Sequence, residues 1–389
     1  MVEEAEETMN KRMLSHAELH FVRVTPVTCW SFLRLYTHDG WIGDGEATFF
    51  RKENEQRSAA ERLIPMALRE ASIEYPSEFA ARHAPSDRIE ASIISALDQA
   101  LWNLHAQSKG QPLANVLGVQ RERIPVYANI NRRTVSRSPV DFASSAFAAV
   151  SEGHKAFKLA PFDEVSNEIC SQGDGVKAMQ AGLDRIAAVR ETVGSEARLM
   201  VDCHWRFDEE TAAVLNEAAA EYGVYWIETP LPEVEANIPA LVRLRKHCNA
   251  LGIRQAGLET SVGWESLLPY CEAGAYDVVM PDVKYIGGLH ELDKTVAGCR
   301  ELDLQVSPHN PSGPICHAFS LHMSAAITAF DMLELQFDES PLFEELVNST
   351  ILPVHNGTTA LLNENGLGVS LLPKLLKQHA DRPVQSWNA

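Results

Sequence analysis

The sequence predicts an α/β fold in which parallel strands alternate with helices around a barrel. Three short apolar runs each end in an acid: LMVD at Asp202, VYWIE at Glu228 and RQAGLE at Glu259. Ionisable residues also recur after apolar runs at intervals of about 25 to 30 residues, the length of one strand and one returning helix. Because the strand ends of such a barrel meet at one face, these side chains should converge there.

The recurring positions define the expected elements of the barrel. The ionisable residues in this series are Lys158, Asp202, Glu228, Glu259, Asp282, His309 and Glu334. We expect strands at about 126–130, 154–160, 198–203, 224–228, 254–259, 276–281, 303–308 and 332–336. Between them, residues 176–192 and 209–222 have the apolar spacing of amphipathic helices.

A smaller α+β domain is expected before the barrel. Residues 18–50 alternate apolar and polar side chains, and turn signals at Thr25-Pro26 and His38-Asp39-Gly40 divide them into three antiparallel strands. Helical spacing follows at 59–71 and 89–108. The predicted domains are therefore 1–124 for the α+β domain, 125–345 for the barrel, and 346–389 for a segment that returns to the first domain.

Composition and charge narrow the class of protein. The 389 residues are 45% hydrophobic and 22% charged, which is typical of a globular chain. The formal net charge of −19 argues against a nucleic-acid partner. No apolar signal segment and no apolar run of about 18 residues occurs, so neither secretion nor membrane insertion is expected. Seven cysteines without CxxC pairs predict reduced thiols in a cytoplasmic protein.

The three strand-end acids favour a divalent metal site. Hard oxygen ligands suit Mg²⁺, with Mn²⁺ as the alternative, and these ions keep positions for water and substrate. A single acid at the end of a strand is more often a helix cap or a turn residue. The regular series is what makes Asp202, Glu228 and Glu259 candidate ligands.

The chain resembles the mandelate racemase subgroup of the enolase superfamily over nearly its whole length. The resemblance rests on these residues and on the segment 95–118, SALDQALWNLHAQSKGQPLANVLG. The resemblance implies a modified TIM barrel of the (β/α)7β kind with an N-terminal capping domain that the C-terminal segment completes. It implies removal of a proton next to a carboxylate, with an enediolate stabilised by the metal. It assigns Asp202, Glu228 and Glu259 as metal ligands, Asp282 and His309 as a proton-transferring dyad, and Glu334 as a hydrogen-bond partner of the substrate carboxylate.

Two positions separate the possible activities within this family. The pattern Asp202-x-His204 resembles the acid-sugar dehydratases, in which such a histidine protonates the departing 3-hydroxyl; if the strand continues, His204 points to the same side as Asp202. Racemases and many dehydratases carry Lys-x-Lys on the second strand, whereas this chain has Lys158-Leu159-Ala160 and so lacks one candidate base for a two-base racemisation. Lys158 remains a candidate cation near the substrate carboxylate. Lys284 is expected to be a loop charge.

Loops of the first domain should cover the barrel mouth and select the substrate. The stretch GDGEATFFR places Thr48, Phe49 and Arg51 in the expected lid. Arg132, with Arg133 beside it, follows the first barrel strand and could meet a second carboxylate or a hydroxyl-rich chain.

The expected function is Mg²⁺-dependent dehydration of an aldonic or aldaric acid to a 2-keto-3-deoxy acid. One alternative is a racemase or epimerase of a 2-hydroxy acid or amino-acid derivative, which shares the first proton transfer. The other is a barrel that binds metal and ligand without turnover, against which the dyad and His204 argue. The expected partner is a small-molecule carboxylate, and the family suggests a symmetric homo-oligomer.

Overall fold

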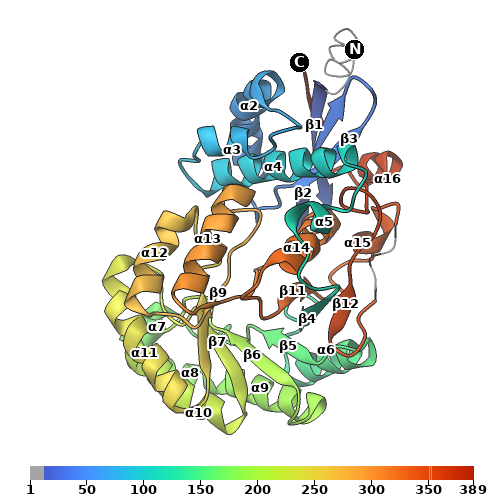
Figure 1. Ribbon diagram of the computed structural model, residues 1–389. Coiled ribbons are helices and arrows are strands. Elements are labelled where there is room, and N and C mark those ends of the chain that lie inside the picture. Colours follow the sequence, from blue (N-terminus) through green and yellow to red (C-terminus); the bar gives the residue numbers. More distant parts are fainter. Residues whose placement is uncertain (1–12, 350, 352) are drawn as a thin grey trace.

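The computed structural model describes residues 13–349, 351 and 353–389. A small domain of strands and helices sits on one end of a larger barrel, and the C-terminus returns to the small domain beside β1 (Figure 1). None of the described helices combines the length and the apolar character needed to cross a membrane.

The small domain has an antiparallel sheet covered by helices. Its strands are β1 (Leu14–Arg23), β2 (Cys29–Thr37), β3 (Ile42–Glu46) and, from the end of the chain, β13 (Gln385–Asn388). They lie in the order β13-β1-β2-β3, which confirms the three-stranded meander and shows that the C-terminal segment completes the sheet. The helices are α2 (Glu53–Glu70), α3 (Glu78–Arg82), α4 (Arg88–Ser108) and α5 (Leu113–Leu117).

All eight expected barrel strands are present. They are β4 (Arg123–Asn129), β5 (Ala156–Leu159), β6 (Arg198–Asp202), β7 (Val224–Glu228), β8 (Arg254–Gly257), β9 (Val278–Val279), β10 (Gln305–Val306) and β11 (Leu333–Gln336). Neighbours run parallel from β4 to β10, and β11 returns to pair with β4. A bridge between Val306 and Phe330, just before β11, closes the circle. β9 and β10 are shorter than expected.

Helices connect successive barrel strands. They are α6 (Pro139–Ser151), α7 (Asn167–Ser171), α8 (Gly175–Ala178), α9 (Gln180–Val193), α10 (Glu209–Glu221), α11 (Ile238–Ala250) after the 3₁₀ turn η1 (Glu235–Asn237), α12 (Trp264–Ala273), α13 (Leu289–Glu301) and α14 (Pro314–Ala326). The expected helix at 176–192 is divided at Met179 into α8 and α9. After β11 come α15 (Leu342–Glu345), β12 (Thr358–Ala360), which pairs with β4, and α16 (Pro373–Gln378). The architecture is therefore the expected (β/α)7β barrel.

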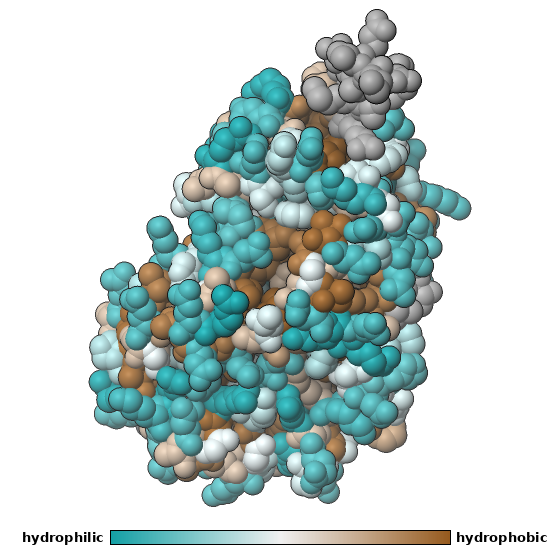
Figure 2. Space-filling view, viewed as in Figure 1, coloured by the Kyte–Doolittle hydropathy of each residue, from teal (hydrophilic) through white to brown (hydrophobic). Residues whose placement is uncertain are grey.

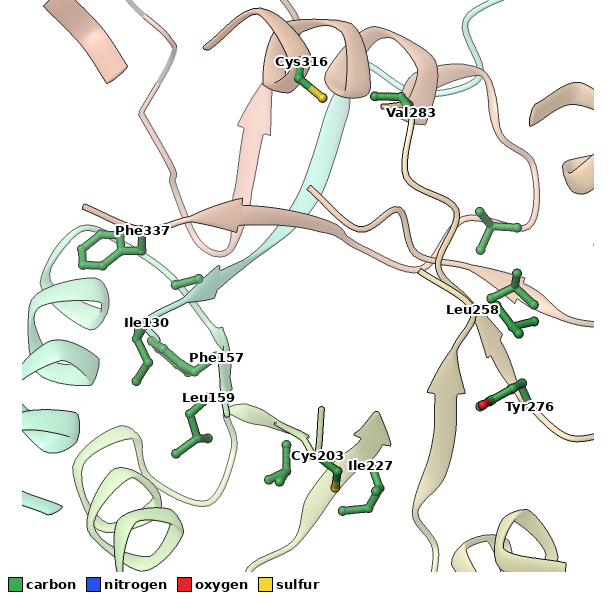
Figure 3. Packing of buried hydrophobic residues seen from close by; sticks show 14 of the residues in the cluster. Ile130, Phe157, Leu159, Cys203, Ile227, Leu258, Tyr276, Val283, Cys316 and Phe337 are labelled. Carbon is green, nitrogen blue, oxygen red and sulfur yellow. The ribbon is translucent and has the colours of Figure 1, made fainter. Parts of the chain in front are cut away.

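Alternation along the strands separates two apolar layers. Phe157, Leu159, Cys203 and Ile227 belong to the large core that the strands share with the helices around them (Figure 3). The alternate residues Met200 and Trp226 belong instead to a smaller cluster, the one that fills the barrel. Asp202 and Glu228 follow these two by two positions and so share their inward direction. Cys203 packs as expected, and all seven cysteines are free and buried.

Hydrophilic and hydrophobic side chains lie on different parts of the outer surface. On the face seen in Figure 2, hydrophilic side chains cover most of the barrel periphery. Hydrophobic side chains show in the hollow where the small domain meets the barrel, around α14 and α5. The small domain therefore covers an apolar region at that end of the barrel.

Two acids of the small domain cap helices of the barrel. Glu46, at the end of β3, accepts hydrogen bonds from the backbone N–H groups of Gly313 (2.7 Å) and Cys316 (2.9 Å) at the start of α14. Asp98, in α4, accepts one from Leu289 (2.7 Å) at the start of α13. These N–H groups have no partner within their own helix, so each carboxylate supplies a cap across the domain boundary.

Close packing between β3 and α4 holds both acids in place. Gly45 lies so near α4 that an added Cβ would be 2.0 Å from the carbonyl oxygen of Ala96. One turn further along, the Gln99 side chain accepts from the backbone N–H of Glu46 and donates to its carbonyl. The loop that follows Glu46 is thereby fixed above the barrel mouth.

The free energy of unfolding of the parent should fall as the pH rises and Asp98 loses its proton, and the Asp98→Asn variant should lack this fall. Burial raises the pKa of Asp98 to about 7, even though Leu289 donates to the carboxylate. An unfolded aspartate has a pKa of about 3.9, so the folded protein keeps this proton where the unfolded chain releases it. The stability that this group contributes is complete below about pH 4 and is lost as the pH rises through about 7.

The free energy of unfolding of the parent minus that of the Asp98→Asn variant should therefore fall by about 2 to 4 kcal/mol between about pH 4 and pH 8. Denaturant unfolding of both proteins across this range measures the difference. Parallel curves would contradict the raised pKa of Asp98.

Candidate active site

A cleft of about 430 Å³ lies at the barrel mouth beneath the small domain. Barrel residues that line it are Asn129, Asn131, Arg132, Lys158, Asp202, His204, Trp205, Glu259, Lys284, Tyr285, His309 and Pro311; Thr28, Cys29, Thr48 and Phe50 come from the small domain. Its volume is in the range of small-molecule sites. Most residues of the predicted ionisable series thus meet at one cleft, with Glu228, Asp282 and Glu334 directly behind its wall.

Lys158 joins two of the buried carboxylates. Its Nζ lies 2.6 Å from Oε1 of Glu228 and 2.9 Å from Oε1 of Glu334, and all three side chains are almost completely buried. Burial opposes the charge on Lys158, but Glu228 and Glu334 raise its pKa well above the ordinary value. Lys158 is therefore a fixed ammonium ion and not a proton acceptor.

Asp202 and His204 form a second buried contact. Nε2 of His204 lies 2.7 Å from Oδ2 of Asp202, and Thr229 donates to Oδ1 at 3.0 Å. Burial alone would raise the pKa of Asp202, but His204 and Lys158 lower it. The Asp202 carboxylate in turn raises the pKa of His204.

The strand does not continue to His204. β6 ends at Asp202, and His204 (φ 47°) and Trp205 (φ 58°) are left-handed. Such φ values are uncommon for residues other than glycine, and here the turn directs the imidazole back to the cleft. His204 reaches the expected side of the mouth by this turn, with 40% of its side chain exposed.

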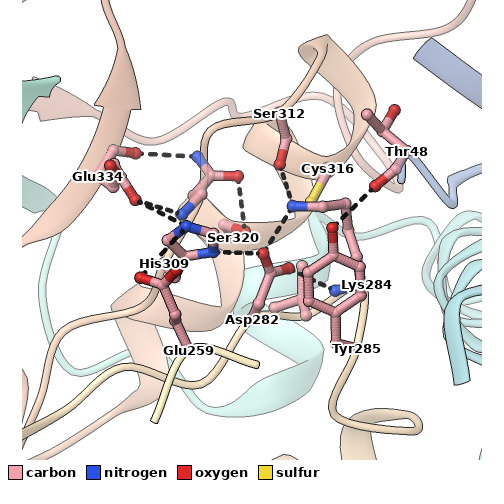
Figure 4. A network of polar contacts seen from close by, with 12 residues as sticks. Thr48, Glu259, Asp282, Lys284, Tyr285, His309, Ser312, Cys316, Ser320 and Glu334 are labelled. Atoms are coloured by element: carbon pink, nitrogen blue, oxygen red, sulfur yellow. Dashed lines mark hydrogen bonds and ion pairs between the residues drawn. The ribbon is translucent and has the colours of Figure 1, made fainter. Parts of the chain in front are cut away.

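Glu259 is the carboxylate that lacks a close donor. It follows β8, and its Oε2 is buried without a hydrogen-bond partner among the described residues. Nε2 of His309 lies 3.6 Å from this oxygen, too far for a hydrogen bond (Figure 4). Burial and the charges of Asp202 and Glu228 raise the pKa of Glu259 well above its ordinary value. A cation placed here would relieve that repulsion.

His309 and Asp282 form the expected dyad. Nδ1 of His309 lies 2.7 Å from Oδ2 of Asp282, which leaves Nε2 directed toward Glu259 and Glu334 (Figure 4). Asp282 is completely buried and His309 is 13% exposed to the cleft. The carboxylate therefore fixes the ring so that Nε2 can exchange a proton with a bound molecule.

Lys284 was expected to be a loop charge, and its placement corrects that expectation. Its ammonium group is buried, lies 2.7 Å from Oδ2 of Asp282 and also donates to Ser312. Burial alone would raise the pKa of Asp282, but Lys284 and His309 lower it. Lys284 thus keeps Asp282 ionised behind the imidazole.

Glu334 acts as an acceptor in this structure. It accepts from the side chain of Asn129 (2.7 Å) and from the backbone N–H of Asn310 (2.9 Å), in addition to Lys158. Burial opposes its charge, but Lys158 and His309 lower the pKa of Glu334. An ionised Glu334 orients donors and cannot itself donate to a substrate carboxylate.

Asn129 is a site residue that sequence reasoning missed. It ends β4 and lines the cleft, where its amide group is held by Glu334. A polar residue directly after the apolar run of a barrel strand was the available signal, the same signal that identified Asp202. The search for ionisable residues passed over it because an amide carries no charge.

The expected lid is only partly over the cleft. Thr48 lines it, and so does Phe50, which was not singled out. Phe49 packs instead against Tyr285, with ring centroids 5.1 Å apart. Arg51 is left-handed and exposed, and its guanidinium group lies over the Phe50 ring. Phe49 and Arg51 therefore support the loop from outside the cleft.

Ala160, which replaces the second lysine of Lys-x-Lys, lies away from the cleft. Ala160 follows β5, is buried, and does not line the cleft; its carbonyl oxygen accepts from Arg137 at 2.6 Å. Only Lys158 from this strand reaches the mouth.

The donor set suits a divalent cation. Asp202, Glu228 and Glu259 supply hard oxygens from three consecutive strands, and Oε2 of Glu259 is buried without a hydrogen-bond partner among the described residues. As they stand, no group of three or more acidic, histidine or cysteine side chains in the described part of the chain is arranged to hold an ion. His204 and Lys158 contact the other two acids, so binding would require these contacts to adjust.

Comparison with known proteins places the chain in a family. Residues 17–118 match the mandelate racemase / muconate lactonizing enzyme N-terminal domain, and residues 141–375 match the enolase C-terminal domain-like family. The chain is a member of the enolase superfamily and belongs to its mandelate racemase / muconate lactonizing enzyme family.

Relatives match along most of the chain. A D-gluconate dehydratase from Thermoproteus tenax is 27% identical over 359 residues, covering 91% of this chain and 70% of that protein. A D-galactonate dehydratase from Verminephrobacter eiseniae is 25% identical over 383 residues, covering 92% and 96%.

Solved structures share the fold. An enolase protein from the environmental genome shotgun sequencing of the Sargasso Sea has a TM-score of 0.80 and 26% identity, covering 97% of this chain and 99% of that chain. A mandelate racemase/muconate lactonizing enzyme from Jannaschia sp. CCS1 has a TM-score of 0.83 and 23% identity, covering 95% and 98%.

Lys158→Met should strongly destabilise the metal-free protein. Methionine keeps the volume but leaves Glu228 and Glu334 buried without their shared cation, which costs about 3 to 5 kcal/mol. Lys155→Met, three residues earlier at an exposed position, is the matched control and should change stability by less than about 0.5 kcal/mol. Urea denaturation in a chelating buffer compares them, and equal midpoints would show that Lys158 does not hold the two acids.

Proposed function

We propose that this chain is a Mg²⁺-dependent dehydratase of sugar acids. It is an enzyme of the hydro-lyase type, as its family and its dehydratase relatives indicate. The substrate is a small acid, proposed to be an aldonic or aldaric acid that loses water to form a 2-keto-3-deoxy acid.

The observation that carries the proposal is the placement of two histidines across the mouth. In the strand order β4 to β11, β6 and β10 lie on opposite sides of the closed barrel. His204 follows β6 and His309 follows β10, and both line the cleft. A molecule bound between them has one proton carrier on each side, as removal of a proton at C2 and of a hydroxyl at C3 requires.

The metal is proposed to be held by Asp202, Glu228 and Glu259. A bound divalent ion would stabilise the negative charge that builds on the substrate carboxylate when C2 loses its proton. The other groups of the cleft supply orientation. Lys158, kept cationic by its two acids, lines the same side of the mouth and is proposed to donate a hydrogen bond to the substrate carboxylate when the metal holds Glu228.

His309 is proposed to remove the C2 proton through Nε2. Asp282 holds Nδ1 and stabilises the imidazolium that results, and Lys284 keeps Asp282 ionised throughout. His204 is proposed to protonate the 3-hydroxyl as it leaves. Dehydration then yields an enol, which becomes the keto acid.

Racemisation or epimerisation remains the nearest rival, because His204 and His309 could also act as bases on the two faces of one carbon. The fate of the intermediate distinguishes the two functions. Incubating the protein and Mg²⁺ with a library of acid sugars, while NMR follows the C2 configuration and the 2-keto group, tests them together. Epimers without keto acid would overturn the dehydratase proposal.

Mg²⁺ should stabilise the parent protein without any substrate. An ion present at 100 times its dissociation constant adds about 2.7 kcal/mol to the free energy of unfolding. Glu259→Gln should lose most of the rise in melting temperature, because it removes the charge that lacks a close donor. Glu265→Gln, on the exposed surface of α12, is the matched control and should keep it. Equal shifts in both variants would remove Glu259 from the ligand set.

Exchange of the C2 proton with D₂O should separate the roles of the two histidines. His309→Asn should stop both exchange and dehydration. His204→Gln should lower the rate of keto-acid formation by a factor of about 10² to 10⁴, the usual contribution of a general acid, while exchange of the C2 proton continues. NMR of the substrate in D₂O measures both rates. Exchange at the parental rate in His309→Asn would place the base elsewhere.

A further inference from the structure

Arg132 reaches the cleft with its charge already compensated. Its Nη1 lies 3.0 Å from Oε2 of Glu339, whose side chain is only 4% exposed, whereas 32% of the Arg132 side chain is exposed. The other oxygen of Glu339 accepts from the hydroxyl of Thr28, in the small domain. Both oxygens of Glu339 are thus engaged, and the acid is fixed behind Arg132.

This pair lies on the side of the mouth away from the proposed metal ligands. Arg132 follows β4 and Glu339 follows β11, which are neighbours in the sheet. In the closed barrel these two strands stand opposite β8 and β7, whose ends carry Glu259 and Glu228. A substrate whose carboxylate is held at the metal side extends its other end toward Arg132.

Every basic side chain among the described residues that line the cleft already pairs with an acid. Lys158 is held by Glu228 and Glu334, and Lys284 by Asp282. His204 and His309, which also line the cleft, pair with Asp202 and Asp282, and Arg132 pairs with Glu339. The other N–H groups of its guanidinium have no hydrogen-bond partner among the residues that the structure describes. These groups can donate to hydroxyl oxygens, which need no net charge.

We propose that the Arg132–Glu339 pair makes the enzyme selective for monocarboxylic sugar acids, the aldonic acids, over dicarboxylic aldaric acids. The inference rests on the proposed dehydratase function. Arg132 binds the hydroxyl groups at the far end of the substrate, and Glu339 compensates its charge so that it does not attract a terminal carboxylate. Glu339 is a positioning residue, since it acts through Arg132.

The chain offers a matched control for this pair. Asp338, next to Glu339, forms an ion pair with Arg133, next to Arg132, at 2.8 Å. Asp338 is 55% exposed, and neither partner lines the cleft. Asp338 has a φ of 45°, a conformation that asparagine tolerates well, so Asp338→Asn removes the same type of charge from the same segment.

The test compares kcat/KM for aldonates (gluconate, galactonate, mannonate) with that for the corresponding aldarates, by release of keto acid with saturating Mg²⁺. The parent should prefer aldonates. Glu339→Gln keeps an acceptor for Thr28 and exposes the charge of Arg132, so the aldarate-to-aldonate ratio should rise by at least about tenfold. Asp338→Asn should leave the ratio unchanged, and Glu339→Gln combined with Arg132→Gln should lose the gain.

Each outcome decides the matter. A parent that dehydrates both classes equally well, or a folded Glu339→Gln variant with an unchanged ratio, overturns the selectivity while the dehydratase function stands. An equal rise in Asp338→Asn also overturns it, because the effect would then be general electrostatics. A parent that dehydrates neither class overturns the proposed function and this inference with it.

Discussion

The barrel mouth depends on the compensation of buried negative charge. Several carboxylates end neighbouring strands where water has little access, and isolated ions in such a place would be very costly. The chain therefore sets a basic side chain against nearly every acid. His204 and Lys284 contact acids two positions earlier in the sequence, whereas Lys158 from β5 serves Glu228 on β7 and Glu334 on β11. Charge pairing and strand order thus constrain one another.

This charge pairing gives different roles to residues of the same chemical type. Lys158 and Lys284 are both buried lysines, yet one faces the cleft between two acids and the other stands behind the dyad. Glu259 differs from the other acids because burial and like charges act on it without a close donor. Position within the network, and not residue type, decides which group is fixed, which can exchange a proton and which attracts a metal ion.

Much of the fold could be predicted from the sequence because its signals are local. An apolar run that ends in a polar residue needs no knowledge of neighbours, and its repetition located all eight barrel strands. The acids at Asp202 and Glu228 were found in the same way. The break at Met179 in the expected helix 176–192 carried no proline or glycine of its own, so helical periodicity ran through it.

What the sequence could not predict are contacts between distant segments. Lys284 looked like a loop charge because nothing nearby in sequence shows that Ser312, 28 positions further on, helps to enclose it. Glu339 carried no signal at all, since its partners Thr28 and Arg132 are more than 200 positions away. His204 reached its expected side through a left-handed turn that strand periodicity does not describe.

The pairing of β13 with β1 has a consequence for synthesis of the chain. β1 begins at Leu14, but one of its two neighbours in the sheet is formed by Gln385–Asn388, the last residues but one. Domains emerging from the ribosome usually fold in order from the N-terminus. Here β1 keeps an open edge until residues 385–388 have been made, and these residues follow the whole barrel sequence. The sheet of the small domain is therefore begun before the barrel and completed after it, and in the interval its exposed edge needs protection from pairing with other chains.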